Sequence, residues 1–172
     1  LLAGGVDLFV IETCMDLLQV KAAMIGCRRA MQAEGRAVPL QVQVTIETTG
    51  RMLVGSEIGA ALTSILAMRP DVIGINCATG PAEMQEHLRY LSQHCPVPIS
   101  VLPNAGLPSV VEGRTHYDLT PAELARYHRY HVADLGITVV GGCCGTTPEH
   151  LRAVVDAVRD VKPARRHPSY QP

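Results

Sequence analysis

The sequence predicts an α/β fold in which short buried strands alternate with amphipathic helices. Five short apolar runs each precede a segment with apolar residues at spacings of three and four, in units of roughly 30 residues. Strands that are apolar on both faces are typical of a parallel sheet covered by helices. A doubly wound sheet and a (β/α)8 barrel both fit this repeat, although a whole barrel takes about 250 residues. No Gly-x-Gly-x-x-Gly follows the first strand, which disfavours a dinucleotide-binding domain.

The strand boundaries follow from the apolar runs, and we expect strands at 7–12, 40–46, 72–77, 99–104 and 137–143. The helices are placed by their caps and stop signals. We expect the first helix to present Leu17, Val20, Met24, Cys27 and Met31 and to stop at Gly35, the second to begin near Ser56 and end at Pro70, and the third to open at Gly80-Pro81.

Two further helices carry N-terminal capping signals. Thr120 and Glu123 are three residues apart before an apolar face, which is the pattern of a capping box, and Gly136 ends that helix. Thr147-Pro148 opens the last helix, which Pro163 stops. The loop 105–118 is long for a strand-to-helix connection, and such loops are often lids or binding loops.

Composition excludes several classes of protein. The chain has 172 residues, 47% of them hydrophobic, and a formal net charge of -1. This composition is globular, and the charge argues against nucleic acid as the main partner. No apolar run approaches the roughly 20 residues that span a bilayer. The six cysteines lie in a chain without a secretory signal, so reduced thiols in the cytoplasm are expected.

The ends of the chain indicate a piece of a longer protein. It opens on Leu1-Leu2-Ala3 without an initiator Met. The tail from Lys162 to Pro168 has the composition of an exposed linker. We therefore expect a domain over residues 1–162 and a linker to a following domain over residues 163–172.

Residues able to do chemistry gather at the ends of the expected strands. Glu12 ends the first strand, Cys77 the third, Asn104 the fourth, and Cys143 and Cys144 the fifth. In parallel α/β folds the carboxyl ends of the strands form the face where ligands bind. These five side chains are therefore expected on one face of the molecule.

The segment 141–145, Gly-Gly-Cys-Cys-Gly, gives the strongest local signal. Adjacent residues of a strand point to opposite faces, so two neighbouring cysteines can serve one metal only if the backbone turns between them. The flanking glycines permit such a turn. Together with Cys77, these thiols make three sulfur ligands and leave the fourth position of a zinc ion open, as suits catalysis.

A simpler interpretation is that these cysteines are small buried hydrophobic residues, and it would be favoured for an isolated Cys-Cys pair. The glycines and the third cysteine at another strand end favour the metal. Cys14, Cys27 and Cys95 are expected to pack instead. Asn104 fits either a turn beside Gly106 or a metal ligand. His87, His94, His128 and His131 are expected on helices, without a metal role.

Three motifs in order resemble the homocysteine-binding domain of the homocysteine S-methyltransferase family. They are Ile73-Gly74-Ile75-Asn76-Cys77, Leu102-Pro103-Asn104-Ala105-Gly106 and Gly141-Gly142-Cys143-Cys144-Gly145. Val10-Ile11-Glu12-Thr13, followed by Asp16 to Ala23, is most similar to the cobalamin-dependent members. The resemblance spans nearly the whole chain.

The resemblance implies a partial (β/α)8 barrel in which these five units are the fourth to the eighth. It implies zinc on Cys77, Cys143 and Cys144, Glu12 on the homocysteine amino group, and Asn104 in the fourth zinc position when substrate is absent. The implied activity is transfer of a methyl group from methylcobalamin to homocysteine held as a zinc thiolate, giving methionine. Methylcobalamin would be bound by another domain, and folate and cobalamin domains would be partners within a longer chain.

Some alternatives remain open. The methyl donor is betaine or S-methylmethionine in other members of the superfamily, and an inactive zinc-binding fragment is a second alternative for the chain taken alone. We also expect the substrate carboxylate near Ala78-Thr79-Gly80, at the N-terminus of the third helix, where free N–H groups would face the pocket. Thr79 is thus a third expected substrate-binding residue.

Overall fold

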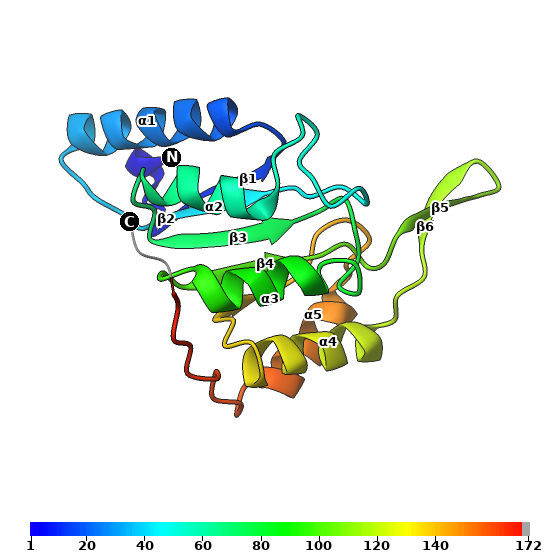
Figure 1. The fold of residues 1–172 in the computed structure, drawn as a ribbon. Helices are drawn as coiled ribbons and strands as arrows, with labels where there is room; N and C mark the ends of the chain where they lie inside the picture. Colours follow the sequence, from blue (N-terminus) through cyan, green and yellow to red (C-terminus); the bar gives the residue numbers. More distant parts are fainter. Residues whose placement is uncertain (170–172) are drawn as a thin grey trace.

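Five parallel strands form the centre of the computed structural model, which describes residues 1–169 (Figure 1). Their order across the sheet is β1-β2-β3-β4-β7, and every neighbouring pair is parallel. The bounds are β1 (Phe9–Cys14), β2 (Leu40–Val44), β3 (Val72–Asn76), β4 (Ile99–Leu102) and β7 (Val139–Val140). This sequential order is that of consecutive βα units in a (β/α)8 barrel, and the expected α/β fold is confirmed.

The helices form a row along one side of the sheet (Figure 1). They are α1 (Leu17–Glu34), α2 (Ile58–Leu66), α3 (Gln85–His94), α4 (Pro121–Ala133) and α5 (Pro148–Val158), and a short 3₁₀ helix, η1 (Leu2–Gly4), precedes β1. Successive helices pack on each other, α1 on α2, α2 on α3, and α4 on α5. The expected capping box of α4, formed by Thr120 and Glu123, is confirmed.

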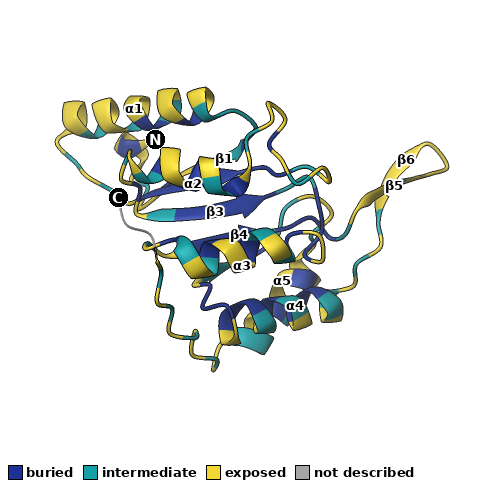
Figure 2. Cartoon of the chain, in the orientation of Figure 1, coloured by how far each residue is buried: buried dark blue, intermediate teal, exposed yellow. Residues whose placement is uncertain are grey.

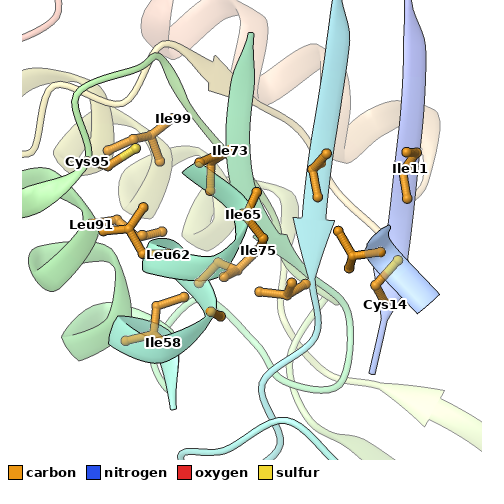
Figure 3. Packing of buried hydrophobic residues seen from close by; sticks show 14 of the residues in the cluster. Ile11, Cys14, Ile58, Leu62, Ile65, Ile73, Ile75, Leu91, Cys95 and Ile99 are labelled. Carbon is orange, nitrogen blue, oxygen red and sulfur yellow. The ribbon is translucent and has the colours of Figure 1, made fainter. Parts of the chain in front are cut away.

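Apolar side chains fill the space between the sheet and the helices. Figure 3 shows this packing, with isoleucines of β1, β3 and β4 against α2 and α3. Figure 2 shows the same division along the ribbon, because β2, β3 and β4 are mostly buried and the outer faces of the helices are exposed. Within the described residues, no helix is long and apolar enough to cross a membrane.

Several expected boundaries are wrong. The N-cap of α2 is Glu57, not Ser56. α3 begins at Gln85, not at Pro81, because Pro81 to Met84 form a turn that the Gln85 N–H closes on the Ala82 carbonyl. The last strand covers only Val139–Val140, since the chain leaves the sheet before it reaches the cysteines.

The long loop 105–118 contains a β-hairpin that projects from the body of the molecule (Figure 1). Its strands are β5 (Pro108–Val111) and β6 (Arg114–Tyr117), which pair in antiparallel register. Its length suggested a lid or binding loop, and that role stays a prediction. The hairpin ends at Tyr117, and that residue returns the chain to the carboxyl edge of the sheet.

Part of the tail packs against the body of the molecule. Arg166 donates from Nη1 to the Cys95 carbonyl at 2.6 Å and from Nη2 to the Val97 carbonyl at 2.7 Å. The Ala164 amide donates to the Val132 carbonyl. The expectation of an exposed tail is therefore wrong for Ala164 and Arg166, which are half-buried, but Arg165 is exposed, and a linker to a further domain stays a prediction. Residues 170–172 of that linker lie outside the described residues.

Replacing Gly74 by Ala is predicted to destabilise the fold. A Cβ on Gly74 in β3 would lie 2.0 Å from Ser100 Oγ and 2.2 Å from the Ser100 carbonyl oxygen on β4. Relief requires a backbone shift, so we expect a loss of about 1–3 kcal/mol in the free energy of unfolding. Chemical denaturation of the two proteins measures this difference.

Gly26 in α1 provides the matched control for this substitution. A Cβ there would meet no atom within 4 Å. Gly26→Ala should therefore gain about 0.5–1 kcal/mol, because Ala loses less backbone entropy than Gly in a helix. Equal effects of the two substitutions would contradict the packing described for Gly74.

Candidate metal centre

Three thiols meet at the carboxyl edge of the sheet. Cys77 directly follows β3, and Cys143 and Cys144 lie beyond the end of β7. The sulfur of Cys144 is 3.7 Å from that of Cys77 and 4.0 Å from that of Cys143, and all three lie within 4.8 Å of one another. Two distant segments of the chain thus bring the predicted cysteines into one cluster.

The end of β4 holds both cysteine segments. The Cys77 amide donates to the Leu102 carbonyl at 3.1 Å, and the Cys143 amide donates to the Pro103 carbonyl at 2.7 Å. The Ala105 amide donates to the Cys144 carbonyl at 2.9 Å. Because these partners lie within four residues at the end of β4, this strand end holds the two cysteine segments side by side.

The backbone near Cys77 adopts an uncommon conformation. Cys77 and Ala78 have φ values of 62° and 60°, in the left-handed region that non-glycine residues rarely occupy. The Thr79 amide closes this turn on the Cys77 carbonyl at 2.7 Å. Each such residue costs of order 1–3 kcal/mol, and such costs are concentrated at functional sites.

Two glycines of the Gly-Gly-Cys-Cys-Gly segment are required for different reasons. Gly145 has φ of 76°, and a Cβ on it would lie 2.4 Å from the Tyr117 ring. Gly142 is needed for space, because a Cβ there would lie 2.2 Å from Thr146 Oγ1. The expected dihedral freedom therefore applies at Gly145, and at Gly142 the reason is close packing.

The donor set fits zinc. Tetrahedral zinc has Zn–S bonds of about 2.3 Å, which places its sulfur ligands about 3.8 Å apart. The separations of the Cys144 sulfur from those of Cys77 and Cys143, 3.7 and 4.0 Å, lie on either side of that value. Cys77 and Cys143 are half-buried and Cys144 is exposed, so a small molecule can approach the cluster from solvent.

Burial and neighbouring sulfurs keep Cys143 protonated in the metal-free protein. Burial, followed by the hydrogen bond and charge of Cys77 and the charge of Cys144, raises the pKa of Cys143 to about 12. Three sulfur atoms this close cannot all carry negative charge unless a cation is present. A divalent metal removes this penalty, and its binding must release the Cys143 proton.

Tyr117 joins the site from the hairpin, and the sequence analysis missed it. Its ring lies beside the cysteine turn, where a Cβ on Gly145 would be 2.4 Å from it. Burial raises the pKa of Tyr117, and Cys144 and the other two cysteines raise it further. Residue Tyr117 lies forty positions after Cys77 in the sequence, on a loop, and only its place before a capped helix hinted at an ordered role.

Glu12 reaches the cluster through Asn76, a second residue that the sequence analysis missed. The Asn76 side-chain nitrogen donates to Glu12 Oε2 at 2.9 Å and lies 3.8 Å from the Cys143 sulfur. Its oxygen accepts from the Thr13 amide at 2.8 Å. Asn76 is fully buried, whereas Glu12 is exposed. The sequence signal for a role of Asn76 was its position directly before Cys77.

Asn104 and Thr79 are both buried beside the cysteines. Asn104 Oδ1 accepts from the Cys144 amide at 3.1 Å, so this side chain supports the cysteine turn. Thr79 does not lie at a helix N-terminus, because α3 begins only at Gln85, and its amide is already bonded to Cys77. The expected position of Thr79 at a helix N-terminus with free N–H groups is therefore wrong. A contact of Thr79 with substrate stays a prediction.

The other cysteines lie apart from this cluster. Cys14 and Cys95 belong to the apolar core, and Cys27 packs against it from α1. Burial raises the pKa of all three thiols. Their packing role is thus confirmed.

The fold and the site define a class: a partial (β/α)8 barrel with a cysteine cluster at the carboxyl ends of its strands. The family model for homocysteine S-methyltransferase matches residues 1–158. The chain belongs to the homocysteine S-methyltransferase family.

The relatives found by comparison are longer proteins. Methionine synthase of Mycobacterium tuberculosis (strain ATCC 25618 / H37Rv) is 55% identical over 172 residues, and methionine synthase of Mycobacterium leprae (strain TN) is 53% identical over 177 residues. Both alignments cover 100% of this chain, but only 14% and 15% of the relatives.

Solved structures support the fold. The apo form of the homocysteine methyltransferase MmuM from Escherichia coli aligns with a TM-score of 0.68 at 22% identity, covering 91% of this chain and 51% of that one. The metallated form gives 0.67 at the same identity, covering 89% and 46%. About half of that chain therefore has the arrangement seen here.

In the metal-free protein, alkylation of Cys143 is predicted to need a higher pH when the chain is folded than when it is unfolded. The folded-state pKa is raised, so the reactive thiolate appears only as the pH rises toward about 12. Iodoacetamide labelling in a chelator, with each site quantified by mass spectrometry, measures this shift. The same cysteine in urea is the control, and coincident pH profiles would contradict the effect of burial.

Proposed function

We propose that this chain is part of a zinc-dependent methyltransferase that activates homocysteine and transfers to it a methyl group from methylcobalamin, giving methionine. The observation that carries the proposal is the convergence of Cys77, Cys143 and Cys144 within 4.8 Å, in a chain of the homocysteine S-methyltransferase family. The free thiols need a reducing compartment, so we assign the protein to the cytoplasm.

The three cysteines would hold the metal and leave one position for the substrate sulfur. Zinc held there supplies Lewis acidity, which removes the proton from a coordinating thiol and makes its sulfur nucleophilic at neutral pH. Cys144 is exposed, so the substrate enters from its side of the cluster. We propose that Asn104 occupies the fourth position when homocysteine is absent; its oxygen would then exchange its bond to the Cys144 amide for one to the metal.

Glu12 would bind the amino group of homocysteine. It is an exposed carboxylate two residues before the end of β1, and Asn76 orients it by a 2.9 Å hydrogen bond. The same Asn76 nitrogen lies 3.8 Å from the Cys143 sulfur, so the amine position and the sulfur position are fixed by one buried side chain. For Thr79, buried beside Cys77, we propose a contact with the rest of the amino acid.

The methyl donor is proposed from the relatives. Two proteins that are more than half identical to this chain are named methionine synthase, and the segment Val10 to Ala23 resembles the cobalamin-dependent members. In that case folate and cobalamin domains lie in the same longer chain. We propose a barrel segment over residues 1–162, the fourth to eighth units, and a linker over 163–172.

Replacing Cys143 by Ala is predicted to abolish stoichiometric zinc binding. Loss of a direct ligand should exceed the about 10–100-fold loss of affinity that follows removal of an outer partner of a metal ligand. Chelator competition measures the affinity, and homocysteine-dependent proton release measures activation of the substrate thiol. Cys27→Ala, which removes a thiol on α1, is the control and should leave both unchanged. Equal zinc content in the two variants would refute the site.

Glu12→Gln is predicted to weaken homocysteine binding about 10–100-fold, because it removes a charge-assisted hydrogen bond to the substrate amine. Zinc affinity should stay within a factor of about three, since Glu12 is not a ligand and Gln keeps the contact with Asn76. Calorimetric titration with homocysteine measures the change. Homocysteine analogues without the amino group supply the control, because they should bind both proteins equally.

The donor is tested by supplying methylcobalamin, betaine and S-methylmethionine in turn. Methionine should form only with methylcobalamin, and methionine production measured by mass spectrometry distinguishes the three. Equal yield from betaine or S-methylmethionine would replace the cobalamin assignment with the donor concerned. It would leave the zinc site and the homocysteine assignment intact, because these rest on the thiols and on Glu12.

A further inference from the structure

Helix α4 carries two fully buried histidines behind the thiol cluster. His128 and His131 are both 0% exposed. Burial lowers the pKa of His128 to about 4, and burial together with neighbouring His128 lowers the pKa of His131 to about 3. Both imidazoles are therefore neutral at neutral pH, and each has one donor and one acceptor nitrogen.

The hydrogen bonds of these side chains can run in only one direction. The Gly141 carbonyl, 2.6 Å from His128 Nε2, can only accept, so His128 carries its proton on Nε2. His128 Nδ1 is then an acceptor, and His131 must donate to it from Nδ1 across 3.3 Å. His131 Nε2 in turn accepts from the Gln85 amide nitrogen at 2.8 Å. The second hydrogen of that nitrogen reaches the Pro81 carbonyl at 3.0 Å.

The two ends of this chain of bonds lie next to the cysteines. Pro81 is four residues after Cys77, and Gly141 is two residues before Cys143. Both cysteine segments also attach to β4 through their backbone amides. The buried side chains are thus a second connection between the two segments, on the helix side of the site.

We propose that Gln85, His131 and His128 form a relay of positioning residues that sets the separation between Cys77 and the Cys143–Cys144 pair for one metal ion. This proposal rests on the proposed function in one respect, namely that the cysteine cluster holds a metal ion. Neither imidazole touches a sulfur, so the relay acts through the two carbonyl groups that it holds. Its bonds are coupled through the His131 ring, because the loss of His131 removes both the donor to His128 Nδ1 and the acceptor for the Gln85 amide nitrogen.

Three hydrogen-bonded polar side chains are not the most stable way to pack this buried region. Buried polar groups cost free energy unless every group is paired, and Gln85 Oε1 is buried without a partner. Apolar side chains would fill the same volume with less penalty. What the relay adds over apolar packing is a fixed distance between two backbone carbonyls.

The tautomers provide the first test, which needs no metal. The sample is the protein in its natural length. At neutral pH its imidazole ¹⁵N spectra should show the Nε2–H form for His128 and the less common Nδ1–H form for His131. Each assignment is made by loss of the signal in His128→Gln or His131→Phe. An Nε2–H form for His131, or an imidazolium at either position, overturns the relay.

Zinc affinity provides the second test. His131→Phe, which keeps the ring volume but breaks the relay, should lower zinc affinity at least about tenfold, as for other partners outside the ligand shell. His128→Gln should keep most of the wild-type zinc affinity, because the amide nitrogen of the new glutamine can still donate to the Gly141 carbonyl. Met24→Ala removes a buried side chain of α1 and controls for a general loss of stability. A melting temperature lowered in His131→Phe and Met24→Ala alike, with unchanged zinc affinity, would show a structural role only.

A third variant and a metal-free probe keep the two proposals separable. Gln85→Leu removes the half-buried end of the relay, and should weaken zinc binding in the same direction if His131→Phe does not fold. Phenylarsine oxide bridges two neighbouring thiols. It should bind the metal-free wild-type protein more tightly than metal-free His131→Phe or Gln85→Leu. If the wild-type protein binds no zinc, the proposed function fails, while equal arsenical binding by all three proteins rejects the relay.

Discussion

The carboxyl end of β4 is the constraint on which the rest of the site depends. Its successive carbonyls, Leu102 and Pro103, accept the amides of Cys77 and Cys143. Parallel strands end on the same edge, but strand spacing alone would leave neighbouring strand ends about 4.8 Å apart and the outer two of three about twice that. The left-handed turn at Cys77 and the early departure of the chain from β7 bring the outer segments together over β4.

This convergence is costly in the metal-free protein, and the costs indicate what the site is for. Cys77 and Ala78 hold left-handed backbone conformations, and burial together with the neighbouring sulfurs keeps Cys143 protonated far above neutral pH. A fold selected for stability alone would avoid both. A divalent cation offsets the second cost directly, since it replaces three competing protons or charges by one shared partner.

Much of this could be predicted from the sequence. The five βα units, the capping box at Thr120 and the gathering of cysteines at strand ends follow from periodicity and residue type, which are local. What failed was tertiary in origin. The start of α3 depends on how Pro81 to Met84 turn above β3, and the hairpin that delivers Tyr117 pairs two short exposed strands with little hydrophobic pattern. Asn76 was visible beside Cys77, but its bonds to Glu12 and Thr13 span more than sixty residues.

Electrostatics unites these parts. Three thiolates around a divalent metal would leave a net negative charge, and Glu12 would add another from the second half of β1. Such a field favours a cationic amine and keeps a bound substrate sulfur electron-rich, which is what a nucleophile for methyl transfer needs. It would be weakened by any positive charge placed behind the cysteines. The two histidines on α4 supply hydrogen bonds there without charge, because burial lowers the pKa of both well below neutral pH. Neutral imidazoles therefore connect the cysteine segments at no expense to the negative potential on which the proposed chemistry depends.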